Sequence, residues 1–477
     1  MPRLNQGTGK YAMRIVDLGR ISRYLLLGSI LLLAQAARPE NRIDSLRKRI
    51  DSWLRQVYPP DGPGAAIFVR EQEATILRKG YGLASLQENI PITPGTSFRI
   101  GSITKQFTAA GILILVGDGD LSIDSPIDSF FPSLKDRGIT IRHLLTHTSG
   151  LRNYTQAPSF LLWSQRGMSK SQLLEFLETN PQEFAPGTNW SYCDSGYFLL
   201  GLVIEEITGM SYERFVTCRI FSPLGMTHSY FGAGTLPQAK GYRVKGLTFE
   251  ESKPVNQSAA YSAGALVTTI DDLARWDAAL YDSRLLRSDL RSLAFSPYKL
   301  MDGKTTSYGF GWLVHRFYGE VFTEHGGIIT GFECHVIRIH RRQIFIVVLS
   351  NSQNRTPSPD FVATKIASFV LGRPYEPSKK RISAGLRRDL QGSYLVPTRG
   401  IRCVEVDGER IYFKYPYGKR REMMPVDSLD YSFSFSFNRV RFVANPLGGI
   451  SGFIFYGKYG EALFGAKVQD AYDLCGI

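Results

Sequence analysis

The run Ile344-Phe-Ile-Val-Val-Leu349 constrains the fold most strongly, because no polar residue interrupts it. Successive side chains of a strand point to opposite faces of a sheet, so a strand of this composition needs apolar cover on both faces. The run is far too short to cross a membrane. It therefore predicts a central, doubly covered strand in a layered domain.

Other strand-like runs lie on both sides of a long helical stretch. Residues 65–69 and 74–77 precede this stretch, and residues 308–314 and 334–339 follow it. The pattern predicts an α+β (α/β layered) domain in which one sheet is built from both ends of the chain segment and the middle is mostly helical. Helical spacing is found at residues 41–58, 102–116 and 360–371.

The pattern changes after residue 374. Residues 375–388 contain Pro, Ser and Gly together with five basic residues, which is typical of a solvated linker. Residues 389–477 show alternating patterns separated by Asp-Gly, Tyr-Gly and Gly-Gly turns, and they predict a small antiparallel β domain. Within it, Phe433, Phe435 and Phe437 are expected on one face of a strand.

The N-terminal residues have the features of an export signal. Arginines precede the apolar run Tyr24–Ala34, which is followed by the small-x-small sequence at residues 34–36. A signal peptide over residues 1–36, cleaved on export, is predicted, and an uncleaved anchor is the alternative. The mature chain is then expected in the periplasm or outside the cell, with no stable membrane span after cleavage.

Composition limits the partners. The formal net charge of +14 suits a protein near anionic envelope polymers, but no recognition motif accompanies it, so nucleic acid is not expected as a partner. Neither GxGxxG nor GxxxxGK[ST] occurs, so nucleotide binding has no support. The five cysteines are widely spaced without CxxC; they leave room for one disulfide, but the sequence does not choose the pair.

Two histidines have a spacing that zinc ligands can use. His143 and His147 stand at i and i+4, but no glutamate lies between them and no third ligand is evident. No metal site is therefore predicted here.

The tetrapeptide Ser102-Ile-Thr-Lys105 is the strongest chemical signal. Positions i and i+3 lie on one helix face, and a lysine there can accept the serine proton if its pKa is lowered. At the start of a helix, the dipole and a free backbone N–H also favour an oxyanion. An isolated motif of this kind is usually an N-cap serine followed by an exposed lysine. Here the apolar neighbours Phe107, Ala110 and Ile114 favour a buried site.

Further motifs follow in order along the chain: Leu144-Leu-Thr-His-Thr-Ser-Gly-Leu151, Tyr192-Cys-Asp194, Ser262-Ala-Gly264, Tyr308-Gly-Phe-Gly-Trp312 and His325-Gly-Gly327. Together with the serine–lysine motif, they resemble the serine beta-lactamase and DD-peptidase superfamily, in the branch that holds class C beta-lactamases, D-alanyl-D-alanine carboxypeptidases and related esterases. The resemblance covers roughly residues 42–372, which implies one hydrolase domain over residues 37–374. A C-terminal β domain is also common in this branch.

The resemblance implies a role for each matching residue. Ser102 would be the nucleophile, Lys105 its activating partner, and Tyr192 the residue that moves a proton between nucleophile and leaving group. Asp194 stands next to the lysine, where the family most often has Asn.

The third motif would line the substrate cleft. His325, Gly326 and Gly327 match it on a strand beside the nucleophile, and the N–H of Ile328 would be the second oxyanion donor, beside that of Ser102.

Two departures from the family pattern change the expected chemistry. A carboxylate at Asp194 favours the charged form of Lys105, which would shift general-base work toward Tyr192. Asp194 also lacks an amide N–H for an acylamino carbonyl. His325 in place of Lys, and Gly326 in place of a hydroxyl residue, weaken recognition of a substrate carboxylate. Both departures argue against efficient penicillin hydrolysis.

We therefore expect an exported serine hydrolase that cleaves an ester, amide or β-lactam carbonyl through a Ser102 acyl-enzyme and needs no cofactor. The expected substrate is a small molecule or a peptide, peptidoglycan fragments included. One alternative is a D-alanyl-D-alanine carboxypeptidase or beta-lactamase proper. The alternative from another class is a penicillin-binding or cell-wall-binding protein without turnover.

Overall fold

The computed structural model describes residues 38–468, except for residues 233, 235–237, 247, 376–379, 398, 416, 417, 419, 447, 459 and 460. The predicted signal peptide, residues 1–36, lies outside the described residues. Within the described residues, no helix combines the length and the apolar character that crossing a bilayer requires.

A six-stranded antiparallel sheet forms the centre of the hydrolase domain, in the order β2-β1-β12-β11-β10-β9. The run that was predicted as a central strand is β12, and all seven of its residues are buried. Ala65 of β1 pairs with Ser350 of β12, so the two ends of the domain meet in one sheet, as predicted. The strands are β1 Ala65–Glu71, β2 Ala74–Tyr81, β9 Leu313–Phe317, β10 Glu320–Ile329, β11 Phe332–Ile339 and β12 Ile344–Ser350.

Helices cover the sheet. The helix α13, Pro359–Val370, packs against β11 and β12, while α11, Ile270–Ala279, packs against β1 and β12. The short 3-10 helix η1, Gly101–Ile103, contacts β10 and β11 and leads directly into α3, Thr104–Asp118. The sheet therefore has the apolar cover that the composition of β12 required.

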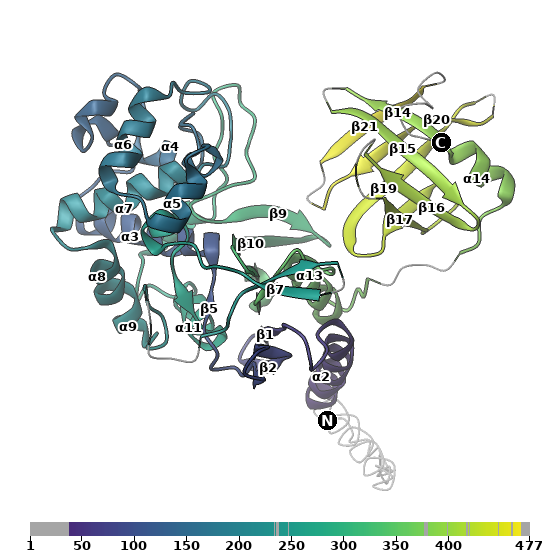
Figure 1. Cartoon of the computed structure of the whole chain (residues 1–477), viewed down its shortest axis with the longest axis horizontal. Coiled ribbons are helices and arrows are strands. Elements are labelled where there is room, and N and C mark those ends of the chain that lie inside the picture. The colour runs from purple at the N-terminus through teal and green to yellow at the C-terminus, as the bar shows by residue number, and fades with distance from the viewer. Residues whose placement is uncertain are drawn as a thin grey trace, which may run out of the picture. The chain divides into compact units, whose positions relative to one another are not determined.

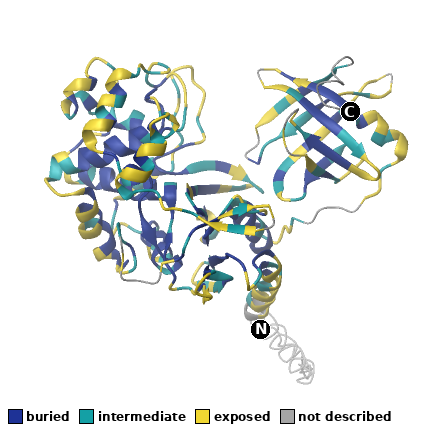
Figure 2. Ribbon diagram, in the orientation of Figure 1, coloured by how far each residue is buried: buried dark blue, intermediate teal, exposed yellow. Residues whose placement is uncertain are grey.

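The middle of the chain is helical, as predicted (Figure 1). The helices α3 and α7, Asp194–Thr208, are apolar around most of their circumference, so they are buried and pack together. Figure 2 shows the buried residues concentrated in this region and in the sheet. The remaining helices are α2 Arg38–Val57, α4 Ile141–Leu145, α5 Phe160–Arg166, α6 Lys170–Thr179, α7 Asp194–Thr208, α8 Tyr212–Val216, α9 Ser222–Leu224, α10 Gln257–Gly264 and α12 Ser288–Ala294.

The hydrolase domain also contains short strands outside the central sheet. The strand β6, Tyr242–Lys245, pairs with β7, Thr248–Glu251, and in parallel with β13, Ser352–Gln353. Two further pairs join β3 to β4 and β5 to β8, and their bounds are β3 Leu83–Ser85, β4 Ile90–Pro91, β5 Phe98–Arg99 and β8 Val267–Thr268.

The C-terminal region forms a closed antiparallel barrel of eight strands, which confirms its predicted antiparallel β character. Its core contains Tyr394, Phe413, Phe442 and Phe453. Closure leaves no sheet edge exposed. The strands are β14 Gly392–Val396, β15 Gly400–Asp407, β16 Arg410–Lys414, β17 Arg421–Pro425, β18 Asp430–Phe433, β19 Ser436–Ala444, β20 Ile450–Tyr456 and β21 Ala462–Val468.

One expectation within the barrel was wrong. The aromatic residues 433–437 do not lie on one strand, because β18 ends at Phe433 and β19 begins at Ser436. Phe433 and Phe437 are buried, but Phe435 lies in the turn between the strands and is 54% exposed. A tight turn reverses the chain there, so the period of two is interrupted.

The segment predicted as a linker also contains a helix. The helix α14, Ala384–Leu390, begins after Ser383, whose side chain accepts a hydrogen bond from the N–H of Leu386. Ile382 and Leu386 pack against the barrel core. An N-cap serine followed by apolar residues at helical spacing explains this helix.

Candidate active site

Ser102 lies in η1, one turn before Lys105 of α3. A Cβ atom on Gly101, which has φ +53°, would lie 2.9 Å from the backbone of Ile328, and one on Gly327 would lie 1.8 Å from the carbonyl oxygen of Ile100. Two glycines therefore allow η1 and β10 to pack backbone against backbone. This contact brings the two predicted oxyanion donors, the N–H groups of Ser102 and Ile328, to the same end of the pocket.

Lys105 is completely buried and has three oxygen neighbours. Its Nζ donates to Ser102 Oγ at 3.1 Å, to Asp194 Oδ1 at 2.7 Å and to the carbonyl oxygen of Ala263 at 2.8 Å. The predicted serine–lysine pair is thus in hydrogen-bond contact inside the protein. A neutral amine at this place could donate its two N–H bonds to Asp194 and Ala263 and direct its lone pair at Ser102.

Asp194 is the first residue of α7, so its carboxylate lies at the positive end of a helix dipole. Its second oxygen, Oδ2, accepts from Asn153 Nδ2 at 3.3 Å and from Thr155 Oγ1 at 3.1 Å. Burial raises the pKa of Asp194, but Lys105 and these hydrogen bonds outweigh that effect and lower it. Asp194 is therefore held as a carboxylate. Sequence reasoning missed Asn153 and Thr155, since nothing in their spacing connects them to Asp194.

The pKa of Lys105 is lowered, because complete burial outweighs the opposing effect of Asp194. The pKa of Tyr192 is raised well above its usual value by burial, and the charge of Asp194 raises it further. The hydroxyl of Tyr192 is buried, its interaction with Ser102 opposes this rise only in part, and the Nζ of Lys105 lies 4.9 Å from its ring centre. The directions of the two shifts fit the predicted role of Lys105 as the activating partner of Ser102, and they do not favour the shift of general-base work toward Tyr192 that a carboxylate at Asp194 suggested.

The surroundings of His325 do not favour the charged form of its imidazole. Its Nδ1 lies 2.6 Å from the carbonyl oxygen of Gly326, so Nδ1 carries the proton, and Nε2 accepts from the hydroxyl of Tyr308 at 2.8 Å. Burial, together with the charge of Lys105, lowers the pKa of His325 to about 3. The imidazole is therefore neutral at physiological pH. Tyr308 belongs to a motif that the sequence showed, but its partner became apparent only in the fold.

His143 and His147 have separate structural roles. His143 closes a capping box with Thr140 at the start of α4. His147 Nδ1 accepts from the N–H of Cys193 at 3.1 Å, and its ring lies 4.2 Å from that of Tyr192, measured between ring centres. His147 thus holds the segment that carries Tyr192 and Asp194.

A pocket of about 270 Å³ opens at Ser102. Asp194 and Ile328 also line it, whereas Lys105, Tyr192, His325, Gly326 and Gly327 are not among its lining residues. The other lining residues are small or uncharged: Gly101, Tyr154, Thr155, Phe160, Val255, Ala259, Ala260, Ala263, Gly264, Ile329, Thr330 and Gln353.

A larger cavity, of about 870 Å³, is lined by barrel residues and by the start of α13, and it contains none of the predicted catalytic residues. The larger volume alone would make this cavity the candidate active site. The contact between Ser102 and Lys105 instead identifies the smaller pocket as the candidate.

The chain is similar in sequence to several known proteins. Penicillin-binding protein 4* of Bacillus subtilis (strain 168) is 28% identical over 406 residues, which cover 80% of this chain and 90% of that protein. D-aminopeptidase of Gluconobacter oxydans (strain 621H) is 28% identical over 365 residues, covering 75% of this chain and 68% of that protein.

Solved structures resemble the fold. D-amino acid amidase of Ochrobactrum anthropi SV3 superimposes with a TM-score of 0.57 at 26% identity, over 70% of this chain and 97% of that one. An octameric penicillin-binding protein homologue from Pyrococcus abyssi has a TM-score of 0.62 at 23% identity, over 90% of this chain and 100% of that one. The Beta-lactamase family model matches residues 55–371, which is more than half of the chain. The protein therefore belongs to the beta-lactamase family, as a serine hydrolase related to penicillin-binding proteins and D-aminopeptidases.

Proposed function

We propose that this protein is an exported hydrolase that cleaves amides and esters of D-amino acids through an acyl-enzyme on Ser102. The observation that carries the proposal is the 3.1 Å contact between Ser102 Oγ and the Nζ of Lys105, a lysine that is completely buried and has a lowered pKa. These are the properties that an amine needs to remove a proton from a serine hydroxyl.

In the proposed acylation step, neutral Lys105 takes the proton of Ser102 as Oγ attacks the substrate carbonyl carbon. The N–H groups of Ser102 and Ile328 stabilise the oxyanion. The proton then passes from Lys105 to the leaving amine or alcohol, with the hydroxyl of Tyr192 as the relay, and the acyl-enzyme remains. In the second step the same lysine takes a proton from water, which attacks the acyl carbon; the bond to Ser102 Oγ breaks, Lys105 returns the proton to Oγ, and the acid is released.

The lining of the pocket supports the substrate class. No lysine or arginine is among its described lining residues, and neutral His325 is not one of them either. A substrate carboxylate, as penicillins and D-alanyl-D-alanine peptides carry, would have no cationic partner there. The one charged lining residue is Asp194, so the pocket favours a neutral or amine-bearing substrate. The activities after which the similar D-aminopeptidase and D-amino acid amidase are named point in the same direction.

Two observations support export. The arginines and apolar run of residues 14–36 have the order of a signal peptide. Cys403 of β15 is disulfide-bonded, while Cys193, Cys218 and Cys334 are free, and disulfides persist mainly in oxidising compartments. N-terminal sequencing of protein recovered from the periplasm or medium tests this point: a start at Ala37 is expected, and retention in the cytoplasm with Met1 or Met13 intact would contradict it.

A second function, covalent capture of penicillin without turnover, is favoured by the similarity to Penicillin-binding protein 4*. It would use the same Ser102 but release its acyl group slowly.

The test compares D-phenylalanine amide with its L-enantiomer, a chromogenic ester, a chromogenic cephalosporin and an acetylated D-alanyl-D-alanine peptide. We expect many turnovers on the D-amide and the ester, little on the two carboxylated substrates, and none with Ser102→Ala. Labelling by penicillin at one equivalent, without turnover of any substrate, would establish the second function instead. Fastest turnover of the D-alanyl-D-alanine peptide would overturn the substrate proposal.

A further inference from the structure

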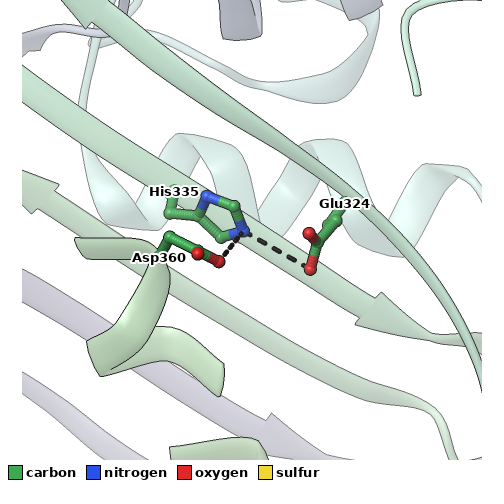
Figure 3. A group of neighbouring side chains, drawn as sticks. All are labelled: Glu324, His335 and Asp360. Carbon is green, nitrogen blue, oxygen red and sulfur yellow. Dashed lines mark ion pairs between the residues drawn. The ribbon is translucent and has the colours of Figure 1, made fainter. Parts of the chain in front are cut away.

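A second group of reactive side chains lies on the other face of β10. Side chains alternate along a strand, so Glu324 and His325 point to opposite faces of the sheet. His335 of β11 pairs with Gly326 and thus shares the face of Glu324. Asp360, at the start of α13, completes the group (Figure 3). This group faces away from Ser102 and has no role in the proposed hydrolysis.

The arrangement of the three side chains has the dimensions of a metal site. His335 Nε2 lies 3.4 Å from Glu324 Oε2 and 3.4 Å from Asp360 Oδ1, and the ligand atoms of all three residues lie within 4.8 Å of one another. Bonds of about 2.0–2.1 Å in a tetrahedron place neighbouring ligand atoms about 3.3–3.4 Å apart. The two imidazole–carboxylate distances therefore match two edges of a zinc tetrahedron.

The imidazole of His335 points at this position. His335 is 4% exposed, and the polar atoms that its Nε2 faces are the carboxylate oxygens of Glu324 and Asp360, each at 3.4 Å. In Figure 3 the Nε2 atom lies toward both carboxylates. A Cβ atom at residue 326 would lie 3.4 Å from His335 Nδ1, so Gly326 leaves room for the ring. A buried imidazole nitrogen that faces two carboxylates is a preferred ligand for a transition metal.

One cation is already present. The ammonium of Lys458, from the barrel, donates to Glu324 Oε1 at 3.0 Å and Oε2 at 3.2 Å, and it also contacts Asp360 Oδ1. These are the oxygens that a metal ion would bind. A metal ion and the Lys458 ammonium therefore exclude each other at this position.

We propose that Glu324, His335 and Asp360 form a binding site for one divalent transition-metal cation such as Zn²⁺, for which the Lys458 ammonium is a tethered competitor. The Lys458 ammonium brings one positive charge to two carboxylates, whereas a divalent cation brings two. The imidazole ligand favours Zn²⁺ over Mg²⁺ or Ca²⁺, which prefer oxygen ligands.

A fourth ligand is within reach. His315 of β9 pairs with Phe322 and so lies on the same face as Glu324, with its Nε2 4.0 Å from Glu324 Oε2. A small rotation of its side chain would complete a coordination set of two histidines and two carboxylates.

The experiment titrates the full chain with Zn²⁺ by calorimetry and with Co²⁺ by visible absorption, which reports tetrahedral coordination. Wild type is compared with Lys458→Met, with Lys458→Met/His335→Ala, and with Lys467→Met, which removes another barrel lysine. We expect Lys458→Met to bind one Zn²⁺ per chain at least about tenfold more tightly than wild type, because the tethered competitor is gone. Lys467→Met should behave like wild type.

Adding His335→Ala to Lys458→Met should abolish the tight binding and the tetrahedral Co²⁺ spectrum. Lys458→Gln, whose amide can still donate to a carboxylate, provides the same test if the methionine variant does not fold. The proposal is wrong if the folded Lys458 variants bind Zn²⁺ no more tightly than wild type, or if the binding survives His335→Ala.

Discussion

Two buried lysines, Lys105 and Lys458, have pKa values that are shifted in opposite directions. Burial lowers the pKa of each, and each contacts carboxylates. Among the residues that the structure describes, Lys105 has Asp194 alone as an anionic partner, and its pKa stays below the usual value. Lys458 has Glu324 and Asp360, and together they raise its pKa. The number of carboxylates thus separates a lysine that can release its proton from one that is held as a cation.

The two lysines act on opposite faces of the same strand. Lys105 lies on the side of His325, beside the nucleophile, whereas Lys458 binds Glu324, the preceding residue of β10. One short segment of sheet therefore separates an acid–base site from an ion-pair cluster, and variants at either lysine test whether their roles differ as described.

The largest effect is expected at the nucleophile and its base. Ser102→Ala should reduce acylation by roughly 10⁴-fold or more, and Lys105→Met by a comparable factor, because the two act as one unit. Both variants should remain folded, since methionine fills the volume of the buried lysine stem. Intact-protein mass spectrometry with an acylating probe measures the effect. Full labelling of Ser102→Ala would show that another residue is the nucleophile.

Lys458→Met should instead reduce stability, by about 3–5 kcal/mol, because it leaves Glu324 buried without its cation. Denaturant unfolding measures the loss. The double variant Lys458→Met/Glu324→Gln is the matched control, and it should recover part of the loss because no buried charge remains unpaired. Equal stability of wild type and Lys458→Met in metal-free buffer would contradict the description of the cluster.

The same cluster predicts a dependence of stability on pH. Although burial raises the pKa of Glu324, Lys458 and His335 lower it well below its usual value of 4.5. Its contribution is therefore fully present above pH 4.5 and is lost as the pH falls toward the folded-state pKa. The pKa of Lys458 is raised, so its contribution is lost only at alkaline pH, as the pH rises through the folded-state value. Acid titration should destabilise wild type more than the double variant Lys458→Met/Glu324→Gln.

Asp194→Asn removes the one carboxylate at Lys105 and so sharpens the contrast between the two lysines. Asp194 raises the pKa of Lys105, so the substitution should lower that pKa further and move the acidic limb of the acylation profile down by about one pH unit or more. The new amide N–H should also raise β-lactam turnover relative to ester turnover, by roughly 10²-fold if it contacts the transition state. An unchanged profile and an unchanged ratio would show that Asp194 does not control the lysine.

Tyr308→Phe should give the smallest effect. It removes the hydroxyl that donates to His325 Nε2 and should cost about 1 kcal/mol of stability, the size of one buried hydrogen bond. Tyr197→Phe, which loses a bond to a backbone carbonyl instead, serves as the control. Nitrogen-15 NMR should find His325 neutral at pH 6 in both wild type and Tyr308→Phe, and a charged imidazole there would contradict the assigned role.

Much of the fold could be predicted because it depends on local patterns. The apolar run at residues 344–349 required a strand covered on both faces, and β12 is that strand. The turn inside residues 433–437 and the helix α14 were not predicted, since short elements depend on which neighbours they pack against.

The candidate site was predicted less completely. Ser102 and Lys105 stand one helical turn apart, so their contact follows from spacing alone. Asn153, Thr155 and Tyr308 could not be assigned in this way, because each reaches its partner across a fold that brings distant segments together.

The sequence by itself thus determined the layered sheet and the serine–lysine turn, since periodicity and helical spacing are local properties. Only the tertiary structure decided which buried lysine has a lowered pKa, that His325 is neutral, and that Glu324, His335 and Asp360 meet behind the sheet. These properties depend on burial and on charges that lie close in space but far apart in the chain. No local pattern records them, because electrostatic interactions depend on distance and on the surrounding dielectric rather than on sequence separation.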